Sequence, residues 1–453
     1  MKQTMVLYPD AGVGHVGPMT QLANVFLKHG YNVTMVLVEP PFYALPPPIH
    51  PSPSMSYRPS FLQTLPPPAS TLLMLQLLHY YNKQFEAFLH AIKRKSLHSV
   101  VLDMFCIDAT DVCVKLGVLV DTFFAGSASC LSALTQLPAL IVGRQTGLKE
   151  LGDTPLDFVG VPPIPASHLI NELLEHPEDE MCKAMINIWK HNTETMGVLL
   201  DTFESLESRA VQSFTGPLCV PERILPPIYC VGPLVGKGAK DDDKVERNEC
   251  LEWLDVQLGR SVVFFCLGSK GALSKEQLKE IAVGLERSGY DDLGKYLKVG
   301  LEPDLGALLP QGFLERTKGR GLVINSWAPQ MDVLGHRATG AFVTHCGWNS
   351  VLEAVVVGVP MLCLPLEAEQ KMNTVCMTED MGVAVELEGY MIGVIKADEV
   401  ETKVQLVIEG EEGSQLRARL ASLREEAEAA LQEGGSSQAA FAQFQLDVDN
   451  IEK

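Results

Sequence analysis

Short apolar runs alternate with segments of helical spacing along almost the whole chain. The run TMVLYP comes first, a helical segment follows from about Pro18 to His29, and NVTMVLVEP comes next. LHSVVLDMF, DTFFAG and MGVLLDTF continue the series. Strands separated by helices are typical of βαβ units, so this pattern predicts a parallel sheet.

A second series begins after the polar segment GKGAKDDDKVERNE, which has the composition of an exposed linker. SVVFFCLGS, GLVINSW, GAFVTHCG and PMLCLPL are its expected strands. A chain of 453 residues is also too long for one ordinary core. We therefore predict an α/β protein of two doubly wound domains that face each other. Their expected bounds are 1–235 and 251–435, with a linker at 236–250 and a final helix at 436–453 that packs back on the first domain.

The composition excludes several classes of partner. A formal net charge of -20 argues against binding to nucleic acid or to an anionic membrane surface, which both need clustered Lys and Arg. The eleven cysteines include no CxxC pair, which favours reduced thiols in the cytoplasm. No apolar run is long enough to span a membrane, and the N-terminus lacks the pattern of a signal peptide. We expect a monomer without a stable membrane anchor.

A glycine motif follows the first strand. Residues 12–17, GVGHVG, are a literal GxGxxG, and Glu39 lies at the end of the next expected strand. That arrangement is typical of a dinucleotide site, which would favour an oxidoreductase. However, His15 falls in the tight turn, where a bulky ring would crowd a pyrophosphate. The alternatives are a bare strand-to-helix turn and a turn that presents His15 for catalysis.

The stretch HCGWNS, residues 345–350, stands where a buried strand becomes a helix. The first N–H groups of a helix and its positive dipole end attract anions, so a diphosphate could bind there despite the negative charge of the chain. His345, Asn349 and Ser350 are then hydrogen-bond donors to phosphate, and Gly347 lets the backbone come close. The alternative is that Asn349 or Ser350 only caps the helix.

The 44 residues from WAPQ at 327 to AEQ at 370 closely resemble the signature box of the plant family 1 UDP-dependent glycosyltransferases. Weaker resemblance covers nearly the whole chain, including ECLEWLD, GFLERTKGRG and EGGSS. The resemblance implies the GT-B fold, in which two Rossmann-like domains enclose a cleft, and a UDP-sugar as donor substrate.

The resemblance also implies roles for single residues in the second domain. The expected contacts are Trp327 on the uracil ring with Ala328 and Gln330 nearby, Glu353 on the ribose, Ser269 on the phosphates, and Trp348, Glu369 and Gln370 on the sugar. Core packing is the alternative for Trp327, and an exposed helix face is the alternative for Glu353. We interpret His336 as a surface histidine.

Sugar transfer with inversion needs a base for the acceptor hydroxyl. His15 has a suitable pKa range, and by resemblance Asp103, at the end of another strand, orients it. Asp108 and Asp111 are nearby alternatives to Asp103. We expect neither a metal nor a nicotinamide cofactor, because the helix terminus and the polar side chains carry the phosphate charge.

The chain departs from the family pattern at two places. Leu364 and Glu367 stand where aromatic residues are usual. After GLERSG, YDDLGKYLKVG has too few apolar residues for the buried strand expected there, so either the second sheet lacks a central strand or residues have been lost from the sequence.

The resemblance implies inverting transfer of a sugar, glucose in view of Gln370, to a hydroxyl of a small, phenolic or flavonoid-type acceptor. Two alternatives stay open: a non-catalytic UDP-sugar-binding protein with a damaged donor domain, and a dinucleotide-dependent oxidoreductase.

Overall fold

The computed structural model describes residues 3–38, 71–92, 96–216, 225–236, 249–269, 271–295, 305–324 and 328–451. The chain forms two compact units, one of residues Met1–Val235 with Ala430–Lys453 and one of Gly236–Ala429. The proline-rich stretch before residue 70 and most of the expected linker lie outside the described residues, as does Glu39.

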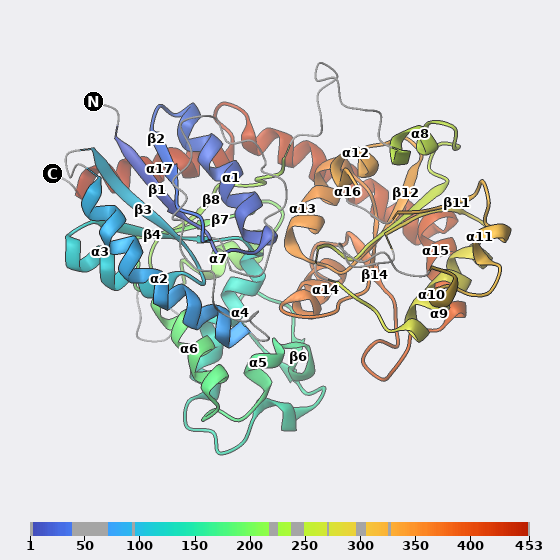
Figure 1. Cartoon of the computed structure of the whole chain (residues 1–453), viewed down its shortest axis with the longest axis horizontal. Coiled ribbons are helices and arrows are strands. Elements are labelled where there is room, and N and C mark those ends of the chain that lie inside the picture. The colour runs from blue at the N-terminus through green and yellow to red at the C-terminus, as the bar shows by residue number, and fades with distance from the viewer. Residues whose placement is uncertain are drawn as a thin grey trace. The chain divides into compact units, whose positions relative to one another are not determined.

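The first unit is built on a parallel sheet of six strands in the order β2-β1-β3-β4-β7-β8 (Figure 1). Its strands are β1 (Thr4–Tyr8), β2 (Asn32–Met35), β3 (Leu97–Asp103), β4 (Leu119–Phe124), β7 (Val198–Leu200) and β8 (Ile228–Cys230). A separate antiparallel pair joins β5 (Pro155–Leu156) and β6 (Ile164–Pro165). The strand order reverses direction beside β1, so the carboxyl ends of β1 and β3 flank a topological switch point, where ligands of such sheets bind.

Helices connect these strands, and most follow the predicted alternation. They are α1 (Val13–Lys28), α2 (Thr71–Ala91), α3 (Thr110–Leu116), α4 (Ala128–Ile141), α5 (Asn171–Leu174), α6 (Glu180–Asn192), α7 (Ser208–Ser213) and α17 (Ser436–Ile451), with 3-10 turns η1 (Ile107–Ala109), η2 (Leu148–Leu151) and η3 (Ala166–His168). The first helix begins five residues before the predicted Pro18, so His15 lies in its first turn and not in a loop before it.

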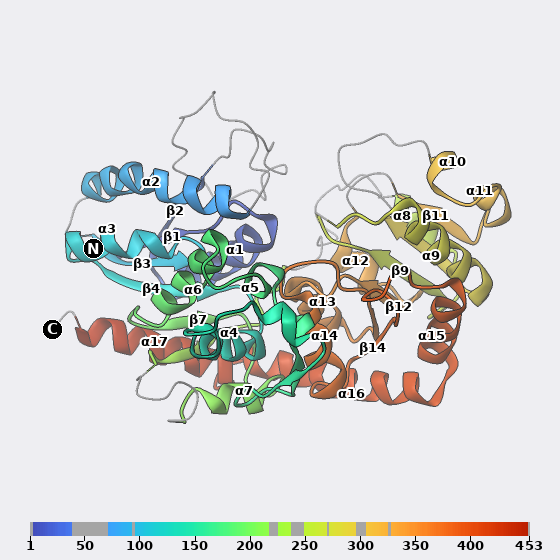
Figure 2. The ribbon, with the colours of Figure 1, turned by 90° about the horizontal axis from the view of Figure 1, so that it is seen from below.

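The two faces of the first sheet bury alternate residues of β1. Val6 and Tyr8 pack beneath α2 and α3, whereas Met5 and Leu7 pack beneath α1 and α17. Figure 2 shows α2 and α3 on one side of the sheet and α17 on the other. Tyr229 of β8 donates a hydrogen bond to Asp447 of α17 (2.7 Å), which fixes the last helix to the first sheet.

The second unit has six parallel strands in the order β11-β10-β9-β12-β13-β14. Its strands are β9 (Val262–Cys266), β10 (Asp291–Lys295), β11 (Gly321–Val323), β12 (Thr339–Thr344), β13 (Met361–Cys363) and β14 (Ala384–Glu386). Its helices are α8 (Glu249–Asp255), α9 (Lys275–Ser288), α10 (Leu305–Leu308), α11 (Phe313–Arg316), α12 (Gln330–Leu334), α13 (Trp348–Val357), α14 (Gln370–Glu379), α15 (Ala397–Glu409) and α16 (Glu411–Leu431). The switch point lies between β9 and β12, next to the residues that follow the carboxyl ends of these strands.

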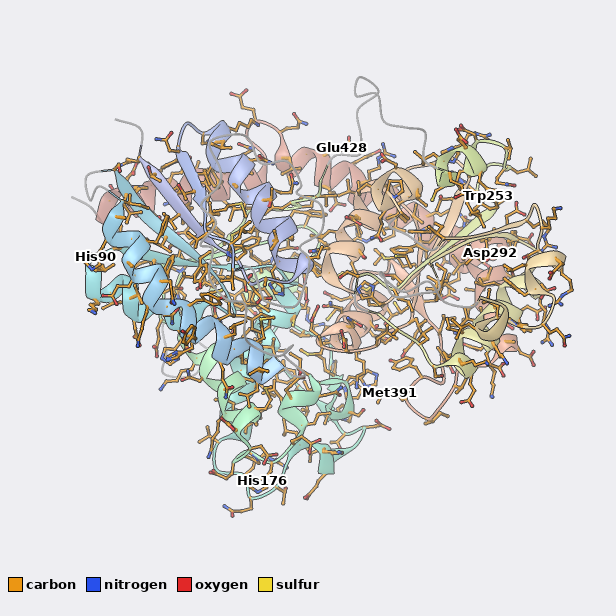
Figure 3. The ribbon with its side chains drawn as sticks, viewed as in Figure 1. His90, His176, Trp253, Asp292, Met391 and Glu428 are labelled. Atoms are coloured by element: carbon orange, nitrogen blue, oxygen red, sulfur yellow. The ribbon has the colours of Figure 1, made fainter. Side chains whose placement is uncertain are left out.

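The strand that the sequence seemed to lack is present as β10. It pairs in parallel with β9 on one side and with β11 on the other, and Asp292 is buried within it (Figure 3). A β-carbon on Gly321 would lie 2.8 Å from the Asp292 carboxylate, so this glycine makes room for a polar side chain in the sheet. Of the two alternatives, the absence of a central strand is contradicted, because backbone pairing on both edges holds this strand despite its polar side chains.

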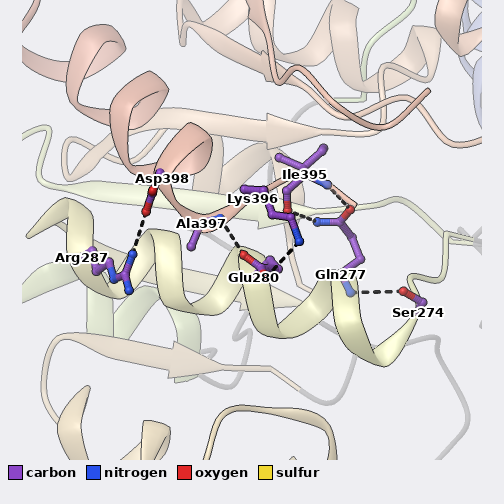
Figure 4. Close-up of polar contacts among 8 residues, drawn as sticks. All are labelled: Ser274, Gln277, Glu280, Arg287, Ile395, Lys396, Ala397 and Asp398. Carbon is purple, nitrogen blue, oxygen red and sulfur yellow. Dashed lines mark hydrogen bonds and ion pairs between the residues drawn. The ribbon is translucent and has the colours of Figure 1, made fainter. Parts of the chain in front are cut away.

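Polar contacts join α9 to the start of α15 (Figure 4). Ser274 caps α9 by accepting from the Gln277 backbone N–H. The Gln277 side chain donates to the carbonyl of Ile395 and accepts from its N–H, so one amide pairs with both backbone groups of that residue. Together with the apolar face of both helices, these bonds fix α15 over the sheet. No helix of the described residues is long and apolar enough to cross a membrane.

Candidate active site

His15 and Asp103 meet at the switch point of the first sheet. His15 Nδ1 lies 2.8 Å from Asp103 Oδ2. Asp103 ends β3 and its side chain is fully buried, while the His15 side chain remains 21% exposed. The carboxylate therefore holds one ring nitrogen inside the protein and turns the imidazole so that the other side of the ring is reachable. Asp108, one of the alternatives, pairs instead with the exposed His79 (3.2 Å).

Three neighbours fix this pair. The backbone N–H of Phe105 donates to Asp103 Oδ1 (3.0 Å), and the Phe105 ring lies 5.2 Å from the His15 ring. Asp10 accepts from the N–H of Gly12 in the turn before α1. A β-carbon at Gly12 would come within 3.3 Å of the imidazole, so the glycine leaves the space that His15 needs.

The glycine motif does not have the packing of a dinucleotide site. In such sites the third glycine allows helix and strand to approach closely. A β-carbon on Gly17 would meet nothing within 4 Å, so this position needs no glycine for packing. The first turn of α1 is instead shaped around His15.

In the second unit, β12 and α13 are joined by a strained turn. Cys346 adopts a left-handed conformation (φ 64°), which is rare for a residue other than glycine. Its N–H donates to Thr344 Oγ1, and its carbonyl accepts from the Asn373 amide (3.0 Å), so both backbone groups are fixed. Gly347 is the N-cap of α13, and no side chain caps the helix there. Asn349 and Ser350 lie in the first turn of the helix, after this N-cap.

His345 fits between two glycines. A β-carbon on Gly347 would lie 2.4 Å from its Nε2, and one on Gly268, the residue before Ser269, would lie 2.8 Å from its Cε1. The glycines of the β9 and β12 loops thus make room for the imidazole next to the start of α13. This brings Ser269, His345 and the first N–H groups of α13 to the switch point of the second sheet, where an anion would find several donors.

Gln330 links α12 to α13. Its amide nitrogen donates to Ser350 Oγ (2.9 Å) and to Glu353 Oε2 (2.6 Å). Burial raises the pKa of Glu353 to about 7, while the hydrogen bond from Gln330 acts in the opposite direction. Glu353 is thus not on an exposed helix face, and a ligand hydroxyl could donate to its carboxylate.

The end of the motif forms a tight loop before α14. Gln370 Oε1 accepts from the N–H groups of Leu366 and Glu367 (2.9 and 3.0 Å), so this part of the amide holds the loop. Glu369 lies 3.5 Å from the Asn373 amide, one helical turn away. The Gln370 NH₂ group and the Glu369 carboxylate are further polar groups of this loop.

The other predicted residues are placed as follows. Trp348 and Ala328 are buried, Asn349 is partly exposed in the first turn of α13, and Trp327 lies outside the described residues. Leu364 is part of the hydrophobic core and Glu367 is exposed. The His336 side chain is half-buried, with 16% of its surface exposed, and it contacts the exposed Asp255 (3.3 Å). Among the described residues, no group of three His, Cys, Asp or Glu side chains could hold a metal.

Comparison with known proteins identifies the chain. The family model described as UDP-glucoronosyl and UDP-glucosyl transferase matches residues 80–427. The chain belongs to the UDP-glycosyltransferase family. Its plant family 1 relatives include the anthocyanidin 5,3-O-glucosyltransferase of a Rosa hybrid cultivar, which is 36% identical over 97% of this chain and 98% of the relative. The phloretin 2'-O-glucosyltransferase of Pyrus communis is 36% identical over 96% and 98%, respectively.

Solved structures of plant enzymes have the same GT-B fold. A UDP-glucosyltransferase from Polygonum tinctorium capable of glucosylating indoxyl matches with a TM-score of 0.87 and 32% identity, covering 99% of both chains. UGT2 of Phytolacca americana, complexed with UDP-2fluoro-glucose and pterostilbene, matches with a TM-score of 0.86 and 29% identity, covering 99% of this chain and 100% of that one. This glycosyltransferase is therefore an enzyme of that fold, and the oxidoreductase alternative is not favoured.

Sequence reasoning missed several residues that support the glycosyltransferase site. Phe105 binds Asp103 through its backbone and contacts His15 through its ring, and Asn373 fixes the turn at Cys346. Phe105 follows Asp103 by two residues, a spacing at which a loop N–H often binds a carboxylate, so a local signal existed. Asn373 is 27 residues from Cys346, and no local pattern indicates this contact.

Proposed function

We propose that this enzyme transfers glucose from UDP-glucose to a hydroxyl group of a phenolic, flavonoid-type acceptor, with inversion at the anomeric carbon. The observation that carries the proposal is the contact of 2.8 Å between His15 and Asp103. Two relatives, an anthocyanidin 5,3-O-glucosyltransferase and a phloretin 2'-O-glucosyltransferase, support the sugar and the acceptor class.

In this mechanism His15 is the general base. With Nδ1–H donated to Asp103, the imidazole carries its lone pair on Nε2, and Asp103 stabilises the imidazolium that forms. The acceptor O–H gives its proton to Nε2 as its oxygen bonds to the anomeric carbon. The bond from that carbon to the diphosphate oxygen breaks on the opposite face, and UDP leaves with the electron pair.

In the second unit the chain stabilises the leaving diphosphate. The start of α13, with Ser350, His345 and Ser269, would donate hydrogen bonds to the phosphates, where negative charge develops. Glu353 would accept hydrogen bonds from the ribose hydroxyls. Glu369 would accept hydrogen bonds from the sugar, and Gln370 would donate a hydrogen bond to it. Donors of this kind carry the phosphate charge, so the proposal includes neither a metal nor a nicotinamide cofactor.

The proposed setting is the cytoplasm, with the enzyme as a monomer. Ten cysteines of the described residues are buried, and no disulfide joins them, which suits a reducing compartment. The negative net charge supports small-molecule substrates over nucleic acid as ligands.

The test is a screen of donors against acceptors with product analysis by mass spectrometry. UDP-glucose, UDP-galactose and UDP-xylose are each combined with flavonoids and simple phenols. We expect a mass gain of one hexose with UDP-glucose and a phenolic hydroxyl. Binding of UDP-glucose without UDP release for any acceptor would contradict the proposal and favour a non-catalytic binding protein.

A further inference from the structure

A cavity of about 440 Å³ lies in the second unit, away from the residues of the candidate active site. Its walls come from the turn before β9, the start of β12, the segment 357–360 and one face of α16. All of these segments meet at the amino ends of the strands, whereas Ser269 and His345 follow the carboxyl ends. A strand of six residues such as β12 separates the two edges by roughly 17 Å. The cavity is therefore distinct from the residues that we propose to bind the diphosphate.

Three arginines line this cavity in a chain of strongly negative net charge. They are Arg260, Arg417 and Arg424. Arg424 pairs with Glu428 one turn along α16, the helix on which Figure 3 labels Glu428. Among the described residues no carboxylate forms an ion pair with Arg260 or Arg417.

Arg260 and Arg417 line the same cavity. Burial, and after it the Arg260 cation, lower the pKa of Arg417. Arg417 Nη1 also donates to the carbonyl of Val407 (2.7 Å), which fixes its guanidinium at the end of α15. Because both cations border one cavity, an anion that binds between them would be stabilised.

The backbone at Arg260 is strained. Its φ of 59° is left-handed, a conformation that is strained for a residue other than glycine. A β-carbon on Gly340 would lie 2.5 Å from the Arg260 carbonyl oxygen, so the β12 backbone packs tightly against this turn. The tight packing holds the arginine in the turn that borders the cavity.

We propose that this cavity binds a phosphate monoester of a small molecule. A phosphate dianion balances the charges of Arg260 and Arg417 and has three terminal oxygens for two guanidinium forks. The wall formed by Val357, Val359, Pro360 and Ala421 is apolar, and a cavity of this volume has room for a small carbon body beside the phosphate. Of the two acidic lining residues, Glu428 is paired with Arg424, so the cavity keeps a net positive charge.

The experiment is calorimetric titration of glycerol 3-phosphate into the full-length protein saturated with UDP, which occupies the proposed diphosphate site. We expect binding of one molecule per chain. Ala421→Glu adds a carboxylate one helical turn from Arg417 at an exposed position, so it leaves the fold intact and should weaken binding at least tenfold. Arg260→Gln should have a similar effect, and Arg287→Gln, an exposed arginine on α9, should have none.

Three results would overturn the proposal. One is the absence of binding to the UDP-saturated protein, and another is unchanged affinity in Ala421→Glu. The third is equal affinity for inorganic phosphate and glycerol 3-phosphate, which would assign the cavity to free phosphate. Glycerol without the phosphate group is the neutral control, and its titration is expected to give no heat of binding.

Discussion

At the scale of single residues, the imidazole of His15 pairs with the buried carboxylate of Asp103, and the role of this pair can be tested by substitution. His15→Ala should lower kcat about 10³-fold, because a positioned general base contributes this order of rate enhancement. In the proposed mechanism UDP binds to the other unit, so the Kd for UDP should stay within about threefold, as measured by calorimetry. His90→Ala, an exposed histidine beside Glu86, is the control and should retain full turnover. Normal kcat in His15→Ala would remove the base from the mechanism.

In the proposed site, Glu353 would couple UDP binding to protonation of its carboxyl group. Glu353→Gln keeps the shape of the side chain and removes the charge that ribose hydroxyls would bind, so UDP affinity at pH 8 should fall about tenfold, the equivalent of one charge-assisted hydrogen bond. Below pH 7, where the native carboxyl is protonated, the difference between the variant and the natural enzyme should shrink. Glu276→Gln, an exposed position on α9, is the control. A pH-independent tenfold loss would contradict the role of the charge.

The sequence indicated most of the site at this scale. Asp103 ends a strand beside a switch point, and His15, Ser269 and His345 follow such strands; strand ends can be located from apolar runs. The roles of Gln330 and Gln370 were less visible. Each amide holds other site residues through contacts that depend on how a loop folds, and such contacts leave no periodic signal in the sequence.

At the scale of elements, the start of α13 depends on glycine. Gly347→Ala places a methyl group 2.4 Å from the present position of the His345 ring, so the imidazole or the helix start must move. We expect UDP affinity to fall at least tenfold, because the first N–H groups of the helix shift with it. Calorimetric titration of UDP measures this change, and an unchanged Kd would contradict it.

The matched control for that substitution is Gly17→Ala in α1. A methyl group there meets nothing within 4 Å, and alanine favours a helix over glycine by about 1 kcal/mol. We expect Tm to rise by a few degrees in thermal unfolding. A decrease would mean that close packing at Gly17 does matter.

The elements also show where sequence patterns fail. β10 carries one leucine in DDLGK, and its pairing on both edges replaces the apolar signal that strands usually have. The early start of α1 was missed because glycine is a poor helix former. In the structure, the contact of His15 with Asp103 outweighs this low helix propensity.

At the scale of the whole molecule, buried carboxyls set the dependence of stability on pH. Burial raises the pKa of Asp121 to about 8 and that of Asp201 to about 7, and it also raises the pKa of Glu207. The unfolded chain releases these protons near pH 4, but the native protein keeps them, so the free energy of unfolding falls as pH rises from about 4 to 8.

Asp121→Asn tests this dependence. Asp121 Oδ2 accepts no hydrogen bond within the described residues, and an amide cannot ionise. The gain in stability of the variant over the natural enzyme should therefore increase between pH 5 and 8, as measured by chemical denaturation at each pH. A gain that is constant with pH would show that ionisation of Asp121 is not the cause.

The last helix bears on how the chain folds as it is made. Phe441, Phe444 and Val448 of α17 complete the core of the first unit, yet they are synthesised after the whole second unit. The final residues must therefore leave the ribosome before the core of the unit that holds His15 is complete. Until then the apolar face beneath β1 and β8 stays exposed to water, and a chain that stops short of residue 436 would leave it so permanently.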